Sequence, residues 1–226
     1  MRQFADLYPN DERGCLPGDK SHKGNSHEIF SMKRAFDVVC SFLGLLCLSP
    51  LLLVIAIAIR LDSAGPVFFR GERVGRNGRS FRIIKFRTMV ADASVYGPVI
   101  TTSGDVRVTR LGRFLRGTKL DELMQMVNIL LGDMSLVGPR PEDLKYVANY
   151  TSEQRKILMY RPGVTSPASI AYRDESAMLA EADWEKIYTE KILPQKLAID
   201  LEYFNNSTVW SDIGIIIKTI GILIRE

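Results

Sequence analysis

The side chains best suited to chemistry in this sequence are an adjacent pair of acids, Asp121 and Glu122. Three arginines precede the pair at intervals of three residues, at Arg110, Arg113 and Arg116. Acids favour the first turn of a helix because of its dipole and free amide groups, so the pair could serve only as a cap. The same helix start could instead keep Asp121 ionised as a nucleophile or metal ligand, while the arginines neutralise phosphate charge. The two interpretations are compatible.

A second group of candidates is Lys85 and Arg87, which alternate with apolar residues in IIKFRTM. Alternate residues of an extended segment share a face, so we expect both to bind substrate beside the acids. The histidines, His22 and His27, have no metal-ligand spacing, so neither a zinc site nor a histidine-based triad can be built. There is also no glycine-rich phosphate loop. The chemistry must therefore use carboxylates, arginines and lysines.

The composition is that of an ordinary globular protein, with 226 residues, 46% hydrophobic and 25% charged. The charge is unevenly distributed. Residues 60–116 contain 12 Lys and Arg against four Asp and Glu, a local net of +8, whereas the whole chain has +4. Such a basic region predicts an anionic partner.

An apolar run at residues 38–59 has 22 consecutive residues without a charge. A straight helix of that length would measure about 33 Å, enough to cross the hydrocarbon core of a bilayer. Ser49-Pro50 lies near its middle, and proline disrupts a straight helix there. Basic residues flank both ends, which opposes a simple crossing. The residues alone leave two interpretations open, a kinked transmembrane helix and a re-entrant hairpin whose break is at Ser49 and Pro50.

The remaining chain reads as short strands and amphipathic helices. We expect extended segments at GPVFF and FRIIKF, and a helix from Thr118, where Thr118 and Asp121 have the spacing of a capping box. Apolar residues at helical spacing follow, at Leu120, Leu123, Val127, Leu130 and Met134. Further helices are predicted at residues 142–158 and at 181–206, the latter interrupted at Pro194. The apolar stretch 213–224 is open to burial or to insertion at a membrane interface.

The predicted fold class is α/β or mainly α, in three parts. Residues 1–31 form a mobile N-terminal tail, and 32–62 form the membrane segment, for which the resemblance described below favours a re-entrant helix with a break. Residues 63–226 form a compact, mostly helical catalytic domain with short strands and interfacial amphipathic helices.

The segment LDELMQMVNILLGDMSLVGPRPE closely resembles the signature of the bacterial sugar transferases, the monotopic phosphoglycosyl transferases that act on polyprenyl phosphate. KRAFDVV, Ser49-Pro50, KFRTM, RVTRLGRFLR and RPGVT also match, so the resemblance covers residues 32 to about 220. There are two departures: Met124 replaces a proline of the family, and Ser166-Pro167-Ala168-Ser169 replaces the family's usual residues after RPGVT. The identity of the sugar therefore cannot be taken from the common form.

The resemblance implies an enzyme that moves a sugar 1-phosphate from a UDP-sugar to polyprenyl (undecaprenyl) phosphate and releases UMP. It implies Asp121 as the covalent nucleophile and Mg²⁺ ligand, Glu122 as its partner, and Arg140 at the phosphate or nucleotide site. It also favours the hairpin over the crossing helix and implies a catalytic domain on the cytoplasmic face of the bacterial inner membrane. The product would begin a bacterial glycan, such as an exopolysaccharide, O-antigen, capsule or glycoprotein.

Two other classes of function compete with this one. A membrane-anchored scaffold would use the basic region to bind anionic lipid and the acid pair as a helix cap. A nucleic-acid module is opposed by the membrane segment and by the few aromatic residues in the basic region. The expected partners are thus the UDP-sugar, the polyprenyl phosphate and membrane lipid, with no nucleic acid, and a homodimer is left open.

Overall fold

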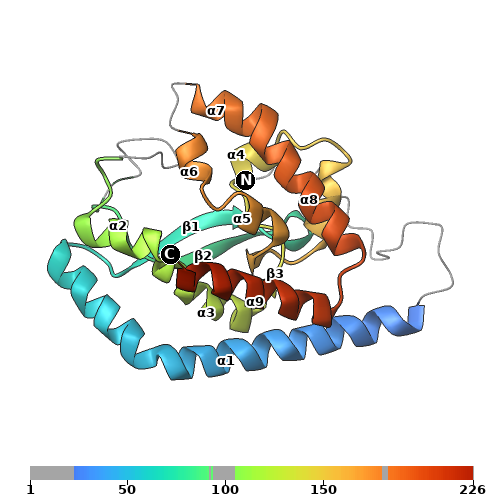
Figure 1. Cartoon of the computed structure of the whole chain (residues 1–226), viewed down its shortest axis with the longest axis horizontal. Helices are drawn as coiled ribbons and strands as arrows, with labels where there is room; N and C mark the ends of the chain where they lie inside the picture. Colours follow the sequence, from blue (N-terminus) through green and yellow to red (C-terminus); the bar gives the residue numbers. More distant parts are fainter. Residues whose placement is uncertain (1–22, 92, 94–104, 180–182, 226) are drawn as a thin grey trace.

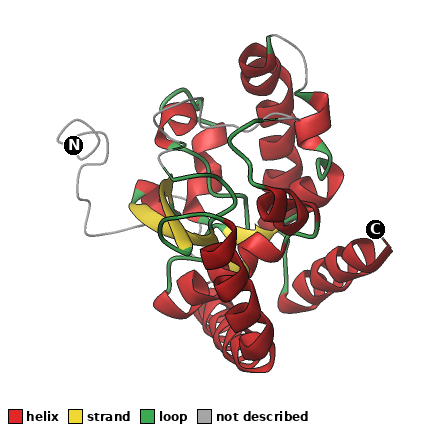
Figure 2. Cartoon of the chain, turned by 90° about the vertical axis from the view of Figure 1, so that its left-hand side faces the viewer, coloured by secondary structure: helices red, strands yellow, loops and turns green. Residues whose placement is uncertain are grey.

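The computed structural model describes residues 23–91, 93, 105–179 and 183–225. It is mostly helical, with two short pairs of strands near the middle (Figure 1). A long helix, α1, forms the base, and the other elements lie on one side of it (Figures 1 and 2). The mostly helical fold with short strands was predicted correctly from the sequence.

Helix α1 spans Lys23–Asp62 and includes the apolar run. Among the described residues it is the one helix long and apolar enough to cross a membrane, over Met32–Asp62. The helix continues through Pro50. Proline cannot donate to the carbonyl of Leu46, and the Ser49 hydroxyl donates to that carbonyl instead, at 2.7 Å. Ser49 therefore satisfies the group that Pro50 leaves without its helical partner.

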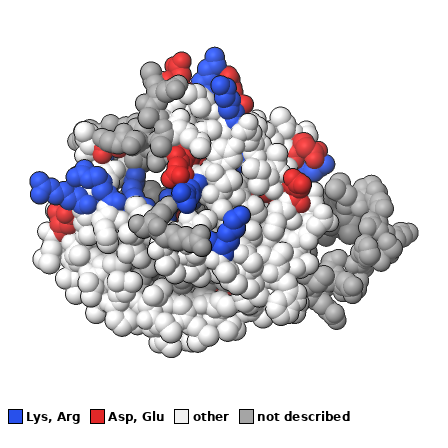
Figure 3. Space-filling model, in the orientation of Figure 1, with Lys and Arg blue, Asp and Glu red and all other residues white. Residues whose placement is uncertain are grey.

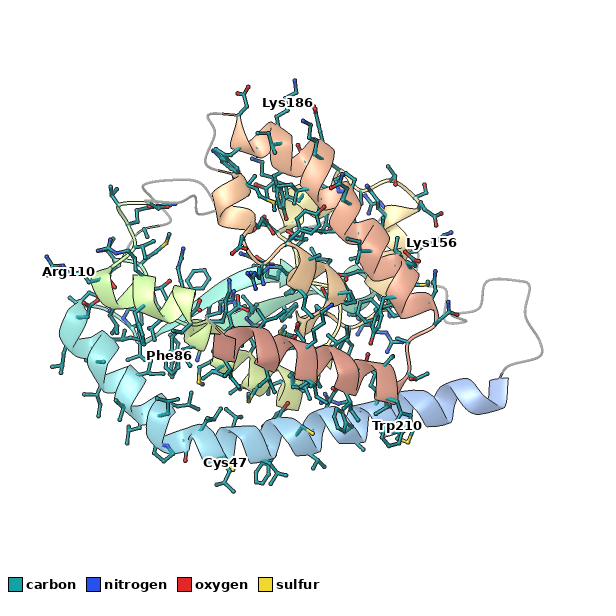
Figure 4. The ribbon with its side chains drawn as sticks, viewed as in Figure 1. Cys47, Phe86, Arg110, Lys156, Lys186 and Trp210 are labelled. Atoms are coloured by element: carbon teal, nitrogen blue, oxygen red, sulfur yellow. The ribbon has the colours of Figure 1, made fainter. Side chains whose placement is uncertain are left out.

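The expected break at Ser49-Pro50 is a bend rather than an interruption of the helix. Figure 4 shows α1 turning upward beyond the labelled Cys47, so that its two halves face the same domain. The start of the helix also differs from the prediction, since residues 23–31, assigned to the tail, belong to α1. Extending an existing helix adds one hydrogen bond per residue without a new nucleus, so these residues need no apolar pattern of their own. Residues 1–22 of the predicted tail lie outside the described residues.

The predicted extended segments form an antiparallel hairpin. Strand β1 (Phe68–Val74) pairs with β2 (Ser80–Phe86), with Phe68 opposite Phe86 and Val74 opposite Ser80. A 3-10 turn, η2 (Arg76–Gly78), connects them. Asn77 and Gly78 have φ of 57° and 74°, the left-handed region that these two residue types tolerate well. The hairpin places Lys85 one residue before the end of β2.

The acid pair lies between two short helices instead of at the start of one long helix. Helix α2 (Arg110–Gly117) is followed by the 3-10 helix η3 (Leu120–Met124) and by α3 (Gln125–Leu131). The predicted capping box is wrong, because Thr118 caps the C-terminus of α2 and donates to the Phe114 carbonyl at 2.9 Å. Lys119 then adopts a left-handed conformation with φ 57°, which reverses the chain into η3.

The C-terminal part is built from short helices and a parallel strand pair. Strand β3 (Ser135–Val137) pairs with β4 (Gly163–Thr165). The helix predicted at 142–158 is two shorter pieces, α4 (Leu144–Val147) and η4 (Gln154–Met159). Helices α5 (Pro167–Ala171) and α6 (Glu175–Met178) follow β4.

The helix predicted at 181–206 begins, within the described residues, as α7 (Trp184–Ile187). It continues through a π-helical turn, η5 (Tyr188–Ile192), into α8 (Leu193–Asn205). Pro194 is the second residue of α8 and directly follows the π-helical turn, whose altered hydrogen-bond register accommodates a residue that has no amide to donate. The last described element is α9 (Val209–Arg225).

Both halves of α1 contact the domain above it. In the first half, Asp37 is buried and accepts hydrogen bonds from Ser135 Oγ at 2.8 Å and Leu136 N at 3.1 Å. Lys33 donates to the Val137 carbonyl at 3.0 Å and forms an ion pair with Asp212 of α9. In the second half, a buried cluster joins α1 to the ends of β2 and α2, through Ile55, Ile59, Phe86 and Leu115.

The outer side of the base is apolar. Large exposed hydrophobic side chains lie along α1 and α9, among them Phe42, Leu46, Leu53, Val54, Ile57, Trp210, Ile217 and Ile220. Figure 3 shows the same division, with almost no charged side chain over α1 and α9 and with charged groups gathered above them. The face bearing α1 and α9 is therefore suited to an apolar environment.

Candidate active site

Asp121 occupies the first turn of η3 and is buried, with 8% of its surface exposed. Its Oδ1 atom has no hydrogen-bond partner, and no side chain caps the start of η3. A buried carboxylate oxygen without a partner is costly to fold and is often found where a ligand binds. The purely capping interpretation of Asp121 therefore finds no support in the geometry.

Glu122, in contrast, is held by two cations. Its Oε1 accepts from Lys85 Nζ at 2.6 Å and from Arg140 Nη2 at 3.3 Å. Burial alone would raise the pKa of Glu122, but Lys85 and then Arg140 outweigh burial and hold the pKa well below its usual range. Glu122 is thus a fixed negative charge that orients Lys85 and Arg140 beside Asp121.

The two neighbouring carboxyl groups have opposite titration behaviour. Burial, and then repulsion from Glu122, raises the pKa of Asp121 to about 6, although Lys85 and Arg116 oppose this. Two adjacent carboxyl groups whose pKa values are shifted in opposite directions are typical of sites where each group has its own role. Asp121 is ionised above about pH 6 and keeps an oxygen available for bonding.

Of the three arginines on α2, Arg116 is the one whose charge acts on the pKa of Asp121. Its Nε donates to Thr88 Oγ1 at 2.7 Å. Burial lowers the pKa of Arg116, and the negative charge of Asp121 opposes that shift. Arg113 is exposed on α2. Arg116 therefore adds positive charge beside Asp121.

Arg87 binds backbone carbonyls of the segment that follows α1. Its guanidinium donates to the carbonyl of Ser63 at 2.6 Å and to that of Ala64 at 2.8 Å. Strand β2 ends at Phe86, so the alternation that would place Arg87 beside Lys85 stops one residue too early. The structure brings Lys85, Arg116 and Arg140 to the acid pair, but gives Arg87 a connecting role.

The loop that carries Arg140 is fixed by two closely approaching backbones. Gly138 and Gly163 face each other, and a Cβ on Gly163 would lie 2.0 Å from Gly138 N. Gly138 N donates to the Thr165 carbonyl at 3.0 Å, and Gly163 N donates to the Pro139 carbonyl at 2.9 Å. The glycines of GPRP and RPG therefore permit the contact that holds Arg140 over Glu122.

Sequence reasoning missed Asn128, which is fully buried in α3 with 0% exposure. Its side-chain amide forms two hydrogen bonds with the edge of β2: it accepts from Ile84 N and donates to the Arg82 carbonyl, each at 2.8 Å. The available signal was a polar residue inside the apolar run MVNILL, since a buried amide requires partners.

The candidate site could hold a magnesium ion through one carboxylate together with substrate phosphates. The described residues contain no group of three or more Asp, Glu, His or Cys that could hold a metal by themselves. Mg²⁺ is commonly bound by one or two carboxylates together with substrate phosphates and water. Glu122 is engaged by cations, and Asp121 Oδ1 has no partner. Asp121 is therefore the protein ligand that this site could offer.

Comparison with known proteins gives a consistent result. The model of the bacterial sugar transferase family matches residues 28–226. A UDP-N-acetylgalactosamine-undecaprenyl-phosphate N-acetylgalactosaminephosphotransferase of Aeromonas hydrophila is 38% identical over 193 residues, which are 84% of this chain and 43% of the relative. An undecaprenyl-phosphate glucose phosphotransferase of Komagataeibacter xylinus is 40% identical over 195 residues, 83% of this chain and 35% of the relative.

This chain thus spans less than half the length of those two relatives. The exopolysaccharide production protein PSS of Rhizobium leguminosarum bv. phaseoli is nearer in size. It is 37% identical over 197 residues, which are 84% of this chain and 93% of the relative. The matched region includes the acid pair, the arginine loop and the apolar helix, and the chain belongs to the bacterial sugar transferase family.

Proposed function

We propose that this chain transfers a sugar 1-phosphate from a UDP-sugar to polyprenyl (undecaprenyl) phosphate. Its products are UMP and a polyprenyl diphosphate sugar, the first membrane-bound intermediate of a bacterial glycan. The observation that carries the proposal is the buried Asp121 oxygen without a partner, beside the cations that Glu122 holds. Both substrates are phosphate esters, which suits a site made of carboxylates, lysine and arginines.

The proposed reaction has two displacements at one phosphorus atom. An oxygen of Asp121 attacks the sugar-proximal phosphate of the UDP-sugar, the bond to the bridging oxygen breaks, and UMP leaves. A phosphate oxygen of the polyprenyl phosphate then attacks the same phosphorus and releases the Asp121 carboxylate. Lys85, Arg116 and Arg140 neutralise phosphate charge during both steps. Asp121 and the substrate diphosphate would together hold Mg²⁺, whose charge favours phosphoryl transfer.

The proposed site lies next to the apolar base, where a lipid acceptor would be within reach. Leu120 and Met124, which flank the acid pair in η3, pack against the cluster that contains Ile55 and Ile59 of α1. A polyprenyl chain in the bilayer could thus present its phosphate to Asp121 while its tail stays among apolar groups.

We propose further that α1 is a re-entrant hairpin in the inner membrane, with the domain on the cytoplasmic side. The support is that both halves of α1 contact the same domain, through Asp37 and Lys33 in the first half and Ile55 and Ile59 in the second. A helix crossing the bilayer would carry one half away from it. Cysteines introduced before Lys33 and after Asp62 should both be labelled from the cytoplasm, and labelling from opposite sides would contradict the hairpin.

The activity is tested by UMP release from purified membranes that contain the chain. Undecaprenyl phosphate, Mg²⁺ and one of UDP-glucose, UDP-galactose and UDP-N-acetylgalactosamine are supplied in turn. We expect release with at least one sugar, dependent on the lipid phosphate and abolished by a chelator. Membranes with Asp121→Asn are the matched control. If no sugar nucleotide of a broader panel gives UMP, the transferase proposal fails and the membrane-anchored scaffold takes its place.

A further inference from the structure

Asn128 makes an unusual contact between a helix and the edge of the hairpin. Its Oδ1 accepts from Ile84 N and its Nδ2 donates to the Arg82 carbonyl, both at 2.8 Å. A third, longer contact of 3.4 Å joins Nδ2 to Asp133 Oδ2. The donor and acceptor positions of the carboxamide are thus both used in the interior of the protein.

The two backbone groups that Asn128 binds belong to the free edge of β2. The other edge of β2 pairs with β1. On the free edge, the carbonyl of Arg82 and the amide of Ile84 both point away from β1. A neighbouring strand would normally bind both groups. The side chain of Asn128 takes the place of the amide and carbonyl that one residue of such a strand would offer.

This contact lies beside the ion pair of the active site. Ile84 immediately precedes Lys85, and Asn128 follows Glu122 by six residues in the continuous η3 and α3 segment. The edge of β2 and the segment bearing the acids are therefore joined at two points, the Asn128 carboxamide and the contact of 2.6 Å between Lys85 and Glu122. Asn128 itself is fully buried and both of its bonds are directional, so the contact fixes where α3 lies along β2.

We propose that Asn128 is a positioning residue for phosphoryl transfer, which sets the register between β2 and η3 so that Lys85 meets Glu122. It acts through Lys85 and Glu122 and does not touch substrate. The kinetic part of the proposal rests on the proposed transferase function. The same fit makes Asn the required residue, because Asp cannot donate to the Arg82 carbonyl and Leu can neither donate nor accept.

The test compares Asn128→Asp with the matched control Asp133→Asn, which alters only the longer contact. Misplacement of about 1 Å at a reacting centre costs roughly a hundredfold in rate, so we expect kcat for Asn128→Asp to fall about 10- to 100-fold. KM for the UDP-sugar should change little, because the lost geometry matters in the transition state. The control should keep wild-type kinetics. Asn128→Ser, which adds no charge, replaces Asn128→Asp if that variant does not fold.

A double-variant comparison separates positioning from general destabilisation. If Asn128 acts through Lys85, combining Asn128→Asp with Lys85→Met should be no slower than Lys85→Met alone. The proposal would be overturned if the reductions in kcat caused by the two substitutions multiplied in the double variant. It would also be overturned by a kcat for Asn128→Asp close to that of the wild type.

A measurement that does not depend on catalysis separates the transferase proposal from the positioning role of Asn128. The acetylation rate of Lys85, followed by mass spectrometry of the digested protein, should rise several-fold in Asn128→Asp and stay unchanged in Asp133→Asn. If the wild-type chain releases no UMP but the Lys85 rate rises, the transferase proposal fails while the positioning role of Asn128 stands. An unchanged Lys85 rate in Asn128→Asp contradicts the positioning role, whatever the activity.

Discussion

Replacing Asp121 by Asn should remove activity and make the protein more stable at neutral pH. In the wild type, burial and repulsion from Glu122 raise the pKa of Asp121 from its ordinary value to about 6. The folded state therefore binds this proton more tightly than the unfolded state. Wild-type stability should fall as the pH rises from about 4 through about 6, because a buried carboxylate must then be ionised. Asn carries no such charge and avoids that loss.

The size of the effect follows from the shift. A pKa that moves from 3.8 to about 6 corresponds to about 3 kcal/mol of stability lost on ionisation. For a chain of this length, 1 kcal/mol changes the melting temperature by about 2 to 4 °C. The difference in melting temperature between Asp121→Asn and wild type should thus grow by about 6 to 12 °C between pH 4 and pH 7.5.

The assay is thermal unfolding of both proteins in the same detergent over that pH range, with UMP release measured in parallel. Asp200→Asn is a matched control, because Asp200 is also buried and burial raises its pKa to about 6. It should show a similar gain above pH 6 but retain activity. If Asp121→Asn is instead less stable at neutral pH, with a difference that shrinks in acid, Asp121 is an ionised helix cap and our reasoning is wrong.

Other substitutions test the surroundings of the acid pair. Lys85→Met leaves the buried Glu122 with Arg140 alone and should lower the free energy of unfolding by about 3 kcal/mol, measured by denaturant titration. Arg140→Ala should cost less than about 1 kcal/mol, because Arg140 is 42% exposed, yet it should slow UMP release, and unchanged kinetics at limiting UDP-sugar would remove it from the site. Arg87→Lys should cost about 1.5 to 3 kcal/mol in the same titration with no change in KM, whereas a raised KM would return Arg87 to the substrate site. Gly163→Ala should destabilise by at least about 1 to 3 kcal/mol and lower kcat, since its Cβ would lie 2.0 Å from the backbone of the loop that carries Arg140.

Much of the arrangement of the candidate site could be predicted from the sequence because its residues lie in short, distinctive segments. Asp121 and Glu122 share one turn, and Lys85 lies in a strand whose apolar pattern was evident. The apolar helix and its bend at Pro50 could also be predicted, since the run without charge and the position of the proline are local features. The contacts of Lys85 and Arg140 with Glu122 confirm that these segments meet.

The remaining features depend on where elements end and on tertiary contacts. Thr118 has the spacing of an N-cap, but the left-handed backbone of Lys119 makes it a C-cap, and a lysine does not signal that conformation. The guanidinium of Arg87 binds the Ser63 and Ala64 carbonyls, and the alternation that would place it beside Lys85 ends with β2 at Phe86. The apolar run around Asn128 indicated a buried amide, but its partners could not be identified because they are backbone groups more than forty residues away in the sequence. Such contacts become visible only once the chain is folded.

The ion pair between Lys33 and Asp212 bears on the order of events during synthesis. The two residues are 179 positions apart in the chain. At about 5 to 20 residues per second, a ribosome needs roughly 9 to 36 s to make Asp212 after Lys33 has been added. During that interval the first half of α1 lacks its partner on α9, and its long apolar run has no domain to cover it. If α1 enters the bilayer as proposed, lipid must receive this helix before the domain is complete, so that the enzyme matures already attached to the membrane that supplies its acceptor.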